Sequence, residues 1–464
     1  MEIHVKPCRP TASIIRLKTK NPGLKYLFYS FLPILSILFL FLLFYFFPKK
    51  PELKKPPPFY HFPSTKNLNC SLIFDKTLEA EIYRKNLSEN RLIYHDDPNL
   101  LSDCDSIKKR GGFFPDVALT KDEQNFPIAF ARIVYKDYYF LETQLKIEYA
   151  PQNSFCYFID SKASNLFKKQ MQNLTKCFDN VFIAKNELDI KSEGHNMTLA
   201  HLSCLRLLRN RQWKYVILLQ NHDVRIKTNA EIVKILKIYN GANDIAANQP
   251  GKHTWDQFLN WTIGGLQLFN YHAFNDIHHS KNLELTKSLV QVSISRAAVD
   301  FVFDELNVEL FIRQLERKGF GVDELFWATL NVDETINLPG GFTRQCLEQN
   351  FSSKTSTRLT VWIKERTPSI PCKSGYFRRW ICVFGIEDLP NLIDAPQFYA
   401  NKLMSEFDFA AVTCLQEKIY NRTFFGNEAT LNVQDYEILP HVRYHKQRVK
   451  NVHVNDFECE MSET

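Results

Sequence analysis

The sequence lacks the short motifs by which many enzyme classes are recognised. None of its 15 glycines forms a G-x-G-x-x-G or a Walker loop, and neither H-E-x-x-H nor G-x-S-x-G occurs. These absences disfavour a dinucleotide fingerprint, a P-loop, a zinc protease and an elbow-type serine hydrolase. Residues 126–425 also contain no Asp-x-Asp that could hold a divalent ion on a diphosphate. We therefore expect no resident metal and no cofactor.

The chain also has no long stretch of one charge sign. Its formal net charge is +7, and part of that excess comes from lysines near the N-terminus. A nucleic-acid-binding protein usually carries a basic stripe, so we expect no nucleic-acid partner. With 45% hydrophobic and 23% charged residues over 464 positions, the chain is long and apolar enough for a sizeable core.

Residues 26–47 form the one long run without a charge. A helix of 22 residues is about 33 Å long, which is enough to cross the hydrocarbon core of a bilayer. No small-residue cleavage site follows the run, so it predicts an uncleaved membrane anchor. Basic residues are in slight excess before it, which favours a cytosolic tail over residues 1–25.

Two features place the rest of the chain on the lumenal side. All N-x-S/T sequons follow the apolar run, at Asn69, Asn86, Asn173, Asn196, Asn260, Asn350 and Asn421. Ten of the 11 cysteines also follow it, and none of them has C-x-x-C spacing. In an oxidising compartment they are expected to form disulfides, whereas in the cytosol they would be buried free thiols.

The lumenal part divides into a stem, a domain and a tail. Residues 48–125 begin with a proline-rich stretch and are interpreted as a stem, and residues 426–464 as a C-terminal tail. Within 126–425, apolar runs at 127–135, 155–160, 180–184 and 214–220 alternate with helical patterns at 138–150, 163–174 and 197–210. This succession predicts an α/β fold with a mostly parallel sheet covered by helices on both faces.

Asp160 and Asp223 each stand just past one of these predicted strands. Ligands of such sheets bind beyond the carboxyl ends of the strands. The two carboxylates are therefore candidates for holding a nucleotide or a sugar. Each could equally cap the next helix or complete a turn.

Eight segments in this order resemble the core 2/I-branching β-1,6-N-acetylglucosaminyltransferase family. They are "FPIAF" at 126–130, "YAPQNSFCYFID", "CFDNVFIA", "KYVILLQNHDVRIKTNAEIV", "DELFWATL", "RRWICVFGIEDL", "YANK" and "FDFAAVTCL". The resemblance covers about 300 residues. It implies a type II Golgi membrane protein with a stem and an A-type, Rossmann-like glycosyltransferase domain that works without metal.

The same resemblance implies a set of disulfides. In the family's pattern the pairs would be Cys70 with Cys414, Cys104 with Cys177, Cys156 with Cys204, and Cys372 with Cys382. Cys346 and Cys459 are left over, either as a fifth pair or as two free thiols.

The resemblance also assigns roles to site residues. Glu324, in "GVDELFWATL", matches the family's catalytic base, which takes the proton of the acceptor hydroxyl. Arg379 and Lys402 match its two diphosphate ligands, and Asp160 and Asp223 match aspartates at the UDP-sugar site. Trp362 falls near a family tryptophan that forms a wall for the acceptor sugar, although a core tryptophan is an equal alternative.

The acidic pair of "GVDELFWATL" also has an ordinary explanation. Two carboxylates at a helix start are favoured by capping and by the helix dipole. If the pair is functional, Asp323 is the expected cap or orienting neighbour and Glu324 the base.

The implied function is transfer of N-acetylglucosamine from UDP-N-acetylglucosamine to a glycan or glycoprotein acceptor in β-1,6 linkage, with inversion. Two alternatives stay open: the same fold with another UDP-sugar, as a xylosyl- or glucuronosyltransferase, or a non-catalytic lumenal glycan-binding protein. The second draws on departures from the family pattern, including Tyr135 in place of a histidine and "NHDVRI" at 221–226.

Overall fold

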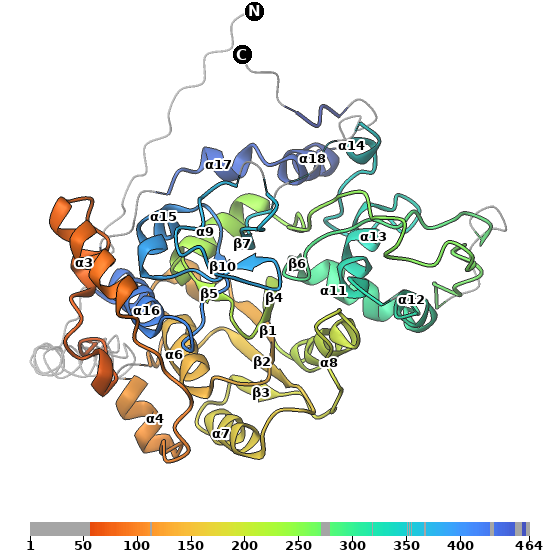
Figure 1. Ribbon diagram of the computed structural model, residues 1–464. Coiled ribbons are helices and arrows are strands. Elements are labelled where there is room, and N and C mark those ends of the chain that lie inside the picture. The colour runs from red at the N-terminus through yellow and green to blue at the C-terminus, as the bar shows by residue number, and fades with distance from the viewer. Residues whose placement is uncertain are drawn as a thin grey trace, which may run out of the picture. The chain divides into compact units, whose positions relative to one another are not determined.

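The computed structural model describes residues 56–111, 114–270, 279–317, 319–349, 351, 353, 355–365, 368–426, 431–450 and 457–460. Its centre is a five-stranded sheet with the strand order β3-β2-β1-β4-β6 (Figure 1). The strands are β1 (Ile128–Val134), β2 (Ser154–Ile159), β3 (Val181–Ile183), β4 (Tyr215–Gln220) and β6 (Ser293–Ser295). The first four are parallel, and β6 pairs antiparallel with β4. The predicted parallel sheet is confirmed.

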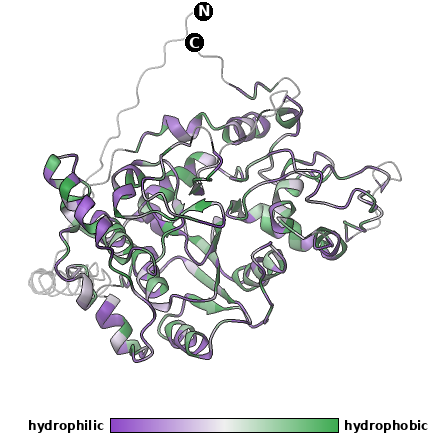
Figure 2. Ribbon diagram, in the orientation of Figure 1, coloured by the Kyte–Doolittle hydropathy of each residue, from purple (hydrophilic) through white to green (hydrophobic). Residues whose placement is uncertain are grey.

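Both faces of this sheet are buried. Successive side chains of a strand point to opposite sides of the sheet, so each strand contributes to a hydrophobic cluster on either face. Along β1, Ile128 and Phe130 belong to one hydrophobic cluster, whereas Ala129 and Ala131 belong to the other. The first cluster is shared with α6 (Tyr138–Glu148), α7 (Asn165–Lys176) and α9 (Asn229–Tyr239). The second is shared with α8 (Met197–Leu208), α11 (Arg296–Asp304), α12 (Glu309–Leu315) and α13 (Phe326–Val332). Figure 2 shows the hydrophobic residues concentrated in these central strands.

The helices predicted between the strands are also confirmed, with bounds that differ by a few residues. The sequence of α9 shows how the N-terminus of one of these helices is fixed. Thr228 accepts a hydrogen bond from the N–H of Glu231, and the Glu231 carboxylate accepts one from the N–H of Thr228. This reciprocal capping box fixes the start of the helix just after β4 and the turn that follows it.

A smaller sheet lies beside the carboxyl end of the central one. It has the order β5-β10-β7, formed by β5 (Val224–Arg225), β10 (Tyr399–Asn401) and β7 (Arg358–Thr360). A two-stranded hairpin, β8 (Phe377–Arg378) and β9 (Ile381–Cys382), stands next to it and is bridged to Trp362. The short helices η2 (Val322–Glu324), α14 (Gln345–Glu348), η3 (Ile386–Asp388) and α15 (Leu389–Asp394) complete this half of the fold.

The expected stem does not stand apart from the domain. Residues 55–464 form one compact unit that includes the N-terminal helices. These helices are η1 (Pro63–Thr65), α2 (Cys70–Ile73), α3 (Leu78–Glu89), α4 (Cys104–Gly111) and α5 (Lys121–Gln124). Helices η1 and α2 pack on α16 (Phe409–Phe424) and α3 packs on η3, whereas α4 packs on α6 and α7, and α5 packs on α9. The helices of the expected stem therefore pack on the domain, and the division at residue 126 stays a prediction.

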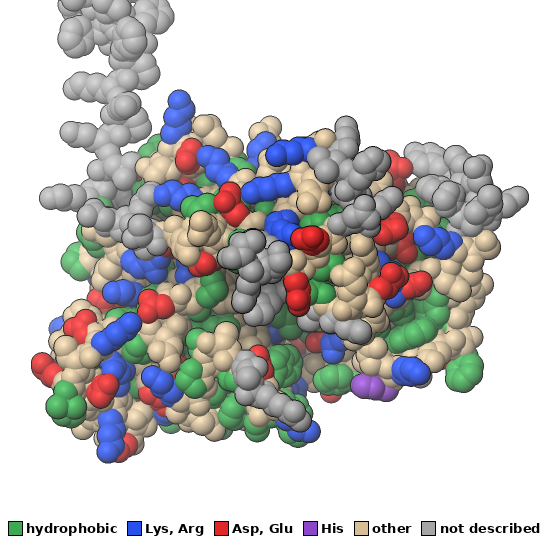
Figure 3. Space-filling view, turned by 90° about the horizontal axis from the view of Figure 1, so that it is seen from above, with side chains coloured by type: hydrophobic (Ala, Val, Ile, Leu, Met, Phe, Trp, Pro, Cys, Tyr) green, Lys and Arg blue, Asp and Glu red, His purple; other side chains and the backbone are tan. Residues whose placement is uncertain are grey.

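Part of the expected C-terminal tail is likewise folded onto the domain. Helices α17 (Gln434–Glu437) and α18 (Pro440–Val449) pack against α9. The His441 ring of α18 is buried, with Nε2 3.2 Å from Oδ1 of the buried Asp244. Lysine and arginine side chains are mixed with acidic ones on the face that α17 and α18 form, seen from above in Figure 3.

Five disulfides join segments far apart in the sequence. They are Cys70–Cys414, Cys104–Cys177, Cys156–Cys204, Cys346–Cys459 and Cys372–Cys382. Four of these pairs are those that the family resemblance implies, and the fifth joins the two cysteines it left over. Cys346–Cys459 ties the end of the chain to the segment after α13.

Several predicted features fall wholly or partly outside the described residues. The tail 1–25, the anchor 26–47 and the sequon Asn350 belong to these, as do residues 48–55 of the stem. Across the described ranges, no helix has the length and hydropathy needed to span a membrane. Of the other sequons, Asn69, Asn86 and Asn260 are exposed, whereas the rest are partly buried. They are Asn173, Asn196 and Asn421.

Candidate active site

The predicted site residues come from three places: the carboxyl ends of β2 and β4, the start of α13, and the segments around β7, β8 and β10. Asp160 follows β2 directly and is 6% exposed. Its Oδ1 accepts a hydrogen bond from the N–H of Lys162, 2.9 Å away, and its own N–H donates to the carbonyl of Val134. Asp160 therefore shapes the turn after β2 at the edge where a ligand would bind.

Asp223 lies deeper, with no exposed surface. Its Oδ2 accepts from the N–H of Gln220 at 2.6 Å, and its Oδ1 accepts from Nδ2 of Asn401 at 2.8 Å. The guanidinium of Arg358 is 3.8 Å from the same Oδ1. The carboxylate thus closes the turn after β4 and fastens β10, whose last residue precedes Lys402.

The acidic pair of "GVDELFWATL" does not cap a helix. Glu324 ends η2 and α13 begins at Phe326, and neither helix has a side-chain cap. The Nζ of Lys287 lies 2.8 Å from Oε2 of Glu324, and the N–H of Ser288 donates to the Glu324 carbonyl. Glu324 keeps 18% of its side chain exposed, while its Oε2 is buried beside Lys287.

Asp323 has a different environment from its neighbour. Its side chain packs against the backbone of Gly194, where an added Cβ would come within 2.1 Å of Oδ1. Burial, and next the charge of Glu324, raises the pKa of Asp323 to about 7. An N–H of Gly321 also donates to the carbonyl of Glu193. Residues 193–194 and 321–323 are therefore docked on each other, which fixes the position of Glu324.

The two candidate cations lie near each other. Lys402 follows β10 and is mostly buried, and its Nζ donates to the carbonyl of Arg378 at 3.4 Å. Burial, and next the positive charges of Arg358, Arg378 and Arg379, lower its pKa to about 8. Arg379 is exposed at the turn between β8 and β9. Several positive charges thus gather where a ligand with negative charge would be stabilised.

The loop after β3 reaches the same region. The pKa of the exposed Glu193 is lowered by a hydrogen bond from Ser192, and the charges of Arg379 and His195 contribute to the shift. Because Glu193 is next to Gly194, the loop lies between Arg379 and Asp323. The loop at 193–194 therefore has Asp323, the neighbour of the predicted base, and the predicted cation Arg379 in its surroundings.

Trp362 follows β7 and is 38% exposed, so it is not a core tryptophan. It forms an antiparallel bridge with Ile381 of β9, and its N–H donates to Oε2 of Glu365 at 3.2 Å. Its indole is available at the surface beside the hairpin that carries Arg379.

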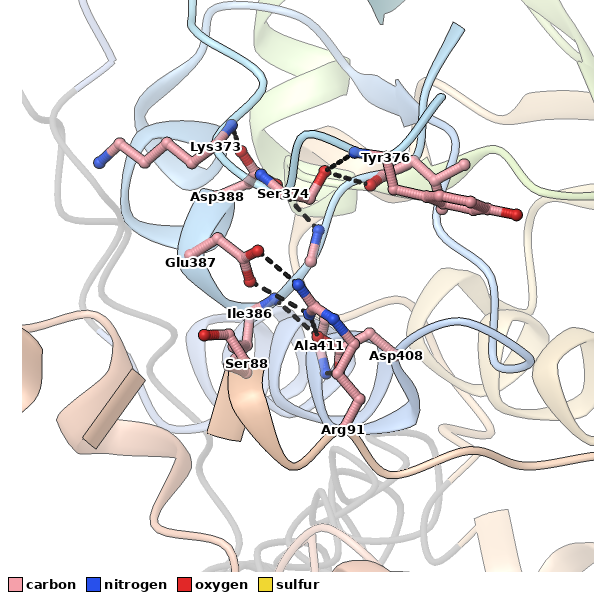
Figure 4. A network of polar contacts seen from close by, with 12 residues as sticks. Ser88, Arg91, Lys373, Ser374, Tyr376, Ile386, Glu387, Asp388, Asp408 and Ala411 are labelled. Carbon is pink, nitrogen blue, oxygen red and sulfur yellow. Dashed lines mark hydrogen bonds and ion pairs between the residues drawn. The ribbon is translucent and has the colours of Figure 1, made fainter. Parts of the chain in front are cut away.

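A polar network holds this hairpin from below (Figure 4). Arg91, in the expected stem, pairs with Glu387 and with Asp408, the N-cap of α16. Asp388 accepts hydrogen bonds from the N–H groups of Lys373, Ser374 and Gly385. The segment 373–388 is therefore clamped at both of its ends.

Sequence reasoning missed several charged residues of the site. Arg358 is buried beside Asp223, and the charges of Asp223, Glu324 and Asp323 all act on its pKa, which burial lowers. Lys287 pairs with Glu324 across 37 positions of the sequence. Neither residue belongs to a motif in the sequence, because their roles depend on strand pairing and on loop docking. Within the ranges that the structure covers, no group of three His, Cys, Asp or Glu side chains could hold a metal ion.

A mostly parallel α/β sheet with charged side chains at its carboxyl edge is typical of enzymes that bind nucleotide-like ligands. The model of the Core-2/I-Branching enzyme family matches residues 128–393. The chain therefore belongs to this family and is a glycosyltransferase.

Three curated proteins that are similar to this chain share one enzyme name. One is beta-1,3-galactosyl-O-glycosyl-glycoprotein beta-1,6-N-acetylglucosaminyltransferase 4 of Danio rerio, 31% identical over 76% of this chain and 84% of the relative. The Homo sapiens enzyme numbered 3 is 29% identical over 80% of this chain and 86% of its own length. The Bos taurus enzyme is 27% identical, covering 77% and 86%.

Among solved structures, the mannosyltransferase Ktr4p from S. cerevisiae in complex with GDP matches with a TM-score of 0.26 at 13% identity. That match covers 59% of this chain and 76% of the mannosyltransferase. A similarity of this size says nothing about the site.

Proposed function

We propose that this chain transfers N-acetylglucosamine from UDP-N-acetylglucosamine to a glycan acceptor in β-1,6 linkage, with inversion and without a metal. The observation that carries the proposal is the position of Glu324. Its carboxylate is paired with Lys287 and partly open to solvent, and it is docked through residues 321–323 to the loop whose other neighbour is Arg379. The printed names of the relatives support the donor sugar and the linkage.

In the proposed reaction the acceptor's hydroxyl oxygen attacks the anomeric carbon of the donor while its proton passes to Glu324. The new C–O bond forms as the bond to the β-phosphate oxygen breaks, so UDP leaves with the electron pair. Attack opposite the leaving group inverts the configuration, and this requires a base on the face away from the diphosphate. Arg379 and Lys402 stabilise the negative charge that develops on UDP.

The remaining site residues have supporting roles in this proposal. Asp160 lies at the edge where the uridine would bind, and Trp362 offers an aromatic face to the acceptor sugar. Asp223 acts indirectly. It accepts a hydrogen bond from Asn401 and so holds the backbone that carries Lys402. We further propose an A-type transferase held in the Golgi membrane as a single-pass type II protein, with residues 26–47 as the anchor. Protease protection of the body in sealed vesicles tests that topology.

Two rival functions remain to be separated by experiment. The first keeps the fold and uses another UDP-sugar, as a xylosyl- or glucuronosyltransferase does. The second is a non-catalytic protein that binds glycans in the lumen. Tyr135, which is 40% exposed just after β1, stands where the family pattern has a histidine, and it is a feature that favours the second of these rivals.

Transfer from a panel of radiolabelled UDP-sugars to a panel of glycans, with and without a chelator, tests the proposal. We expect transfer from UDP-N-acetylglucosamine that a chelator does not reduce. The change Glu324→Gln should lower kcat by about 10²- to 10⁴-fold, as for loss of a general base. The matched change Glu365→Gln, at another glutamate of the same region, should lower it far less. Transfer from UDP-xylose alone, or full activity of Glu324→Gln, contradicts the proposal.

A further inference from the structure

The turn between β8 and β9 has an unusual composition. It consists of two residues, Arg379 and Trp380, with φ values of 51° and 67°. Positive φ at both central positions is the requirement of a type I′ hairpin, for which Asn-Gly and similar pairs are preferred. Side chains with a Cβ are disfavoured in this region, and strained residues of this kind cluster at functional sites. The turn therefore carries Arg and Trp at a cost to stability.

Burial of the Trp380 ring does not offset this loss of stability. The residue is 61% exposed, and its neighbours in the paired segment, Trp362 and Ile363, are 38% and 47% exposed. The carbonyl of Trp380 accepts a hydrogen bond from the N–H of Ile363 at 2.9 Å. The Nζ of Lys364 lies 5.4 Å from the centroid of the ring. The fold uses the backbone of Trp380 and leaves its indole at the surface.

The surroundings of the indole indicate its ligand. Trp380 directly follows Arg379, the proposed diphosphate ligand, and its segment pairs with that of Trp362, the proposed acceptor wall. Exposed apolar groups that gather in one place mark binding sites. An indole offers a flat apolar surface that suits the C–H face of a pyranose. A glycan that enters the site past Trp362 would therefore reach the tip of the hairpin.

We infer that Trp380 is a further acceptor-binding residue, on which a sugar of the acceptor glycan stacks beside the one that receives the transferred residue. This inference rests on the proposed function, because it takes Arg379 as the donor's ligand. It assigns the two residues of the turn to the two substrates: Arg379 to the donor and Trp380 to the acceptor.

The turn geometry allows a test in which structure and function change in opposite directions. In Trp380→Gly the ring is lost while positive φ becomes easier, so the melting temperature of the full-length chain should stay equal or rise. The KM for an oligosaccharide acceptor should rise roughly 3- to 10-fold, as for loss of one aromatic contact. The KM for the UDP-sugar should not change. Trp380→Phe should restore most of the acceptor KM, and the exposed Phe425→Ala is the control.

The outcomes separate this inference from the proposed function. If Trp380→Gly has the wild-type acceptor KM, or if it lowers the melting temperature and shifts both KM values together, the inference is wrong and the proposed function stands. If the wild-type chain transfers no sugar, the proposed function fails. In that case saturation-transfer NMR with the same oligosaccharides still decides whether Trp380 binds them, since only loss of the signal in Trp380→Gly supports the inference.

Discussion

Lys287 and Glu324 form an ion pair of 2.8 Å, and the residue after Lys287 donates its N–H to the carbonyl of Glu324. One short segment therefore holds both the side chain and the backbone of the proposed base. Lys287 is also tied to Asn248 by backbone hydrogen bonds in both directions. The ion pair thus gives the Glu324 carboxylate a fixed direction.

We expect Lys287→Met to lower kcat about tenfold with little change in either KM, because the base loses its orientation while both substrates still bind. Lys287→Arg should keep most of the activity. Steady-state kinetics measure both effects, and Lys281→Met, at an exposed lysine of the same loop, serves as the control. An unchanged kcat in Lys287→Met would show that the pair has no role in turnover.

Activity should depend on the protonation of Lys402. Its pKa is lowered to about 8, so the charged form is lost as the pH rises through that value. Because the proposed role of Lys402 requires a positive charge, kcat/KM for the UDP-sugar should fall above about pH 8. Lys402→Arg keeps its charge in this range, so its profile should lack this fall. The comparison requires pH profiles of both proteins, and a fall that persists in Lys402→Arg assigns it to another group.

Asp323 should make the chain less stable at alkaline pH. Its pKa is raised to about 7 in the folded state, so the folded chain binds a proton that the unfolded chain lacks between about pH 4 and pH 7. Stability contributed by this group therefore rises as the pH falls from 7 towards 4. Asp323→Asn removes the titration, so its free energy of unfolding should exceed that of the wild type at pH 8 by a few kcal/mol.

Urea unfolding of both chains at several pH values measures this difference, which should shrink towards pH 5. A difference that is constant with pH would mean that Asp323 is not protonated in the folded chain at low pH. The variant Glu324→Gln cannot be used in place of Asp323→Asn, because the charge of Glu324 contributes to the raised pKa of Asp323.

Arg91 should stabilise the donor site from the N-terminal segment. Its guanidinium pairs with Glu387 and with the nearly buried Asp408, whose second oxygen caps α16. Arg91→Met leaves Asp408 without its cation, and breaking a buried pair in this way costs about 3 kcal/mol. The KM for the UDP-sugar should also rise, since the segment 385–388 precedes β10 and Lys402.

The control for Arg91 is Lys85→Met in the exposed pair Lys85–Glu89, where the effect should be below about 1 kcal/mol. Urea unfolding gives the free energies, and initial-rate kinetics give the KM. If Arg91→Met and Lys85→Met have equal effects, Arg91 does not stabilise the site.

Local patterns were sufficient for the central sheet. The runs "IAFARIV" and "YVILLQ" are apolar on both faces and are separated by helical repeats, so their burial in a parallel sheet could be predicted. The motif "DELFWATL" put Glu324 forward through a family resemblance, and the role of this residue stays a prediction. The prediction of the sheet succeeds because hydrophobic period is a property of neighbouring residues.

Other parts of the site could not be predicted, because they depend on contacts between distant segments. The pairing of Lys287 with Glu324 and the burial of Arg358 beside Asp223 each need two loops or strands to meet. The packing of the expected stem on the domain depends on such contacts as well. A proline-rich start looks independent in the sequence, whereas Arg91 and Cys70 fasten the following helices to α16.

The sequence by itself determined the order of strands and helices, the position of all N-x-S/T sequons after residue 47, the lack of familiar motifs and the identity of the acidic pair. The tertiary structure decided which carboxylate is buried and which is open. Asp323 is enclosed because Gly194 lets the loop after β3 close onto it, whereas Glu324 pairs with Lys287 and keeps 18% of its side chain exposed. Burial is set by what packs on a side chain, so two adjacent residues of the same chemistry acquired different environments.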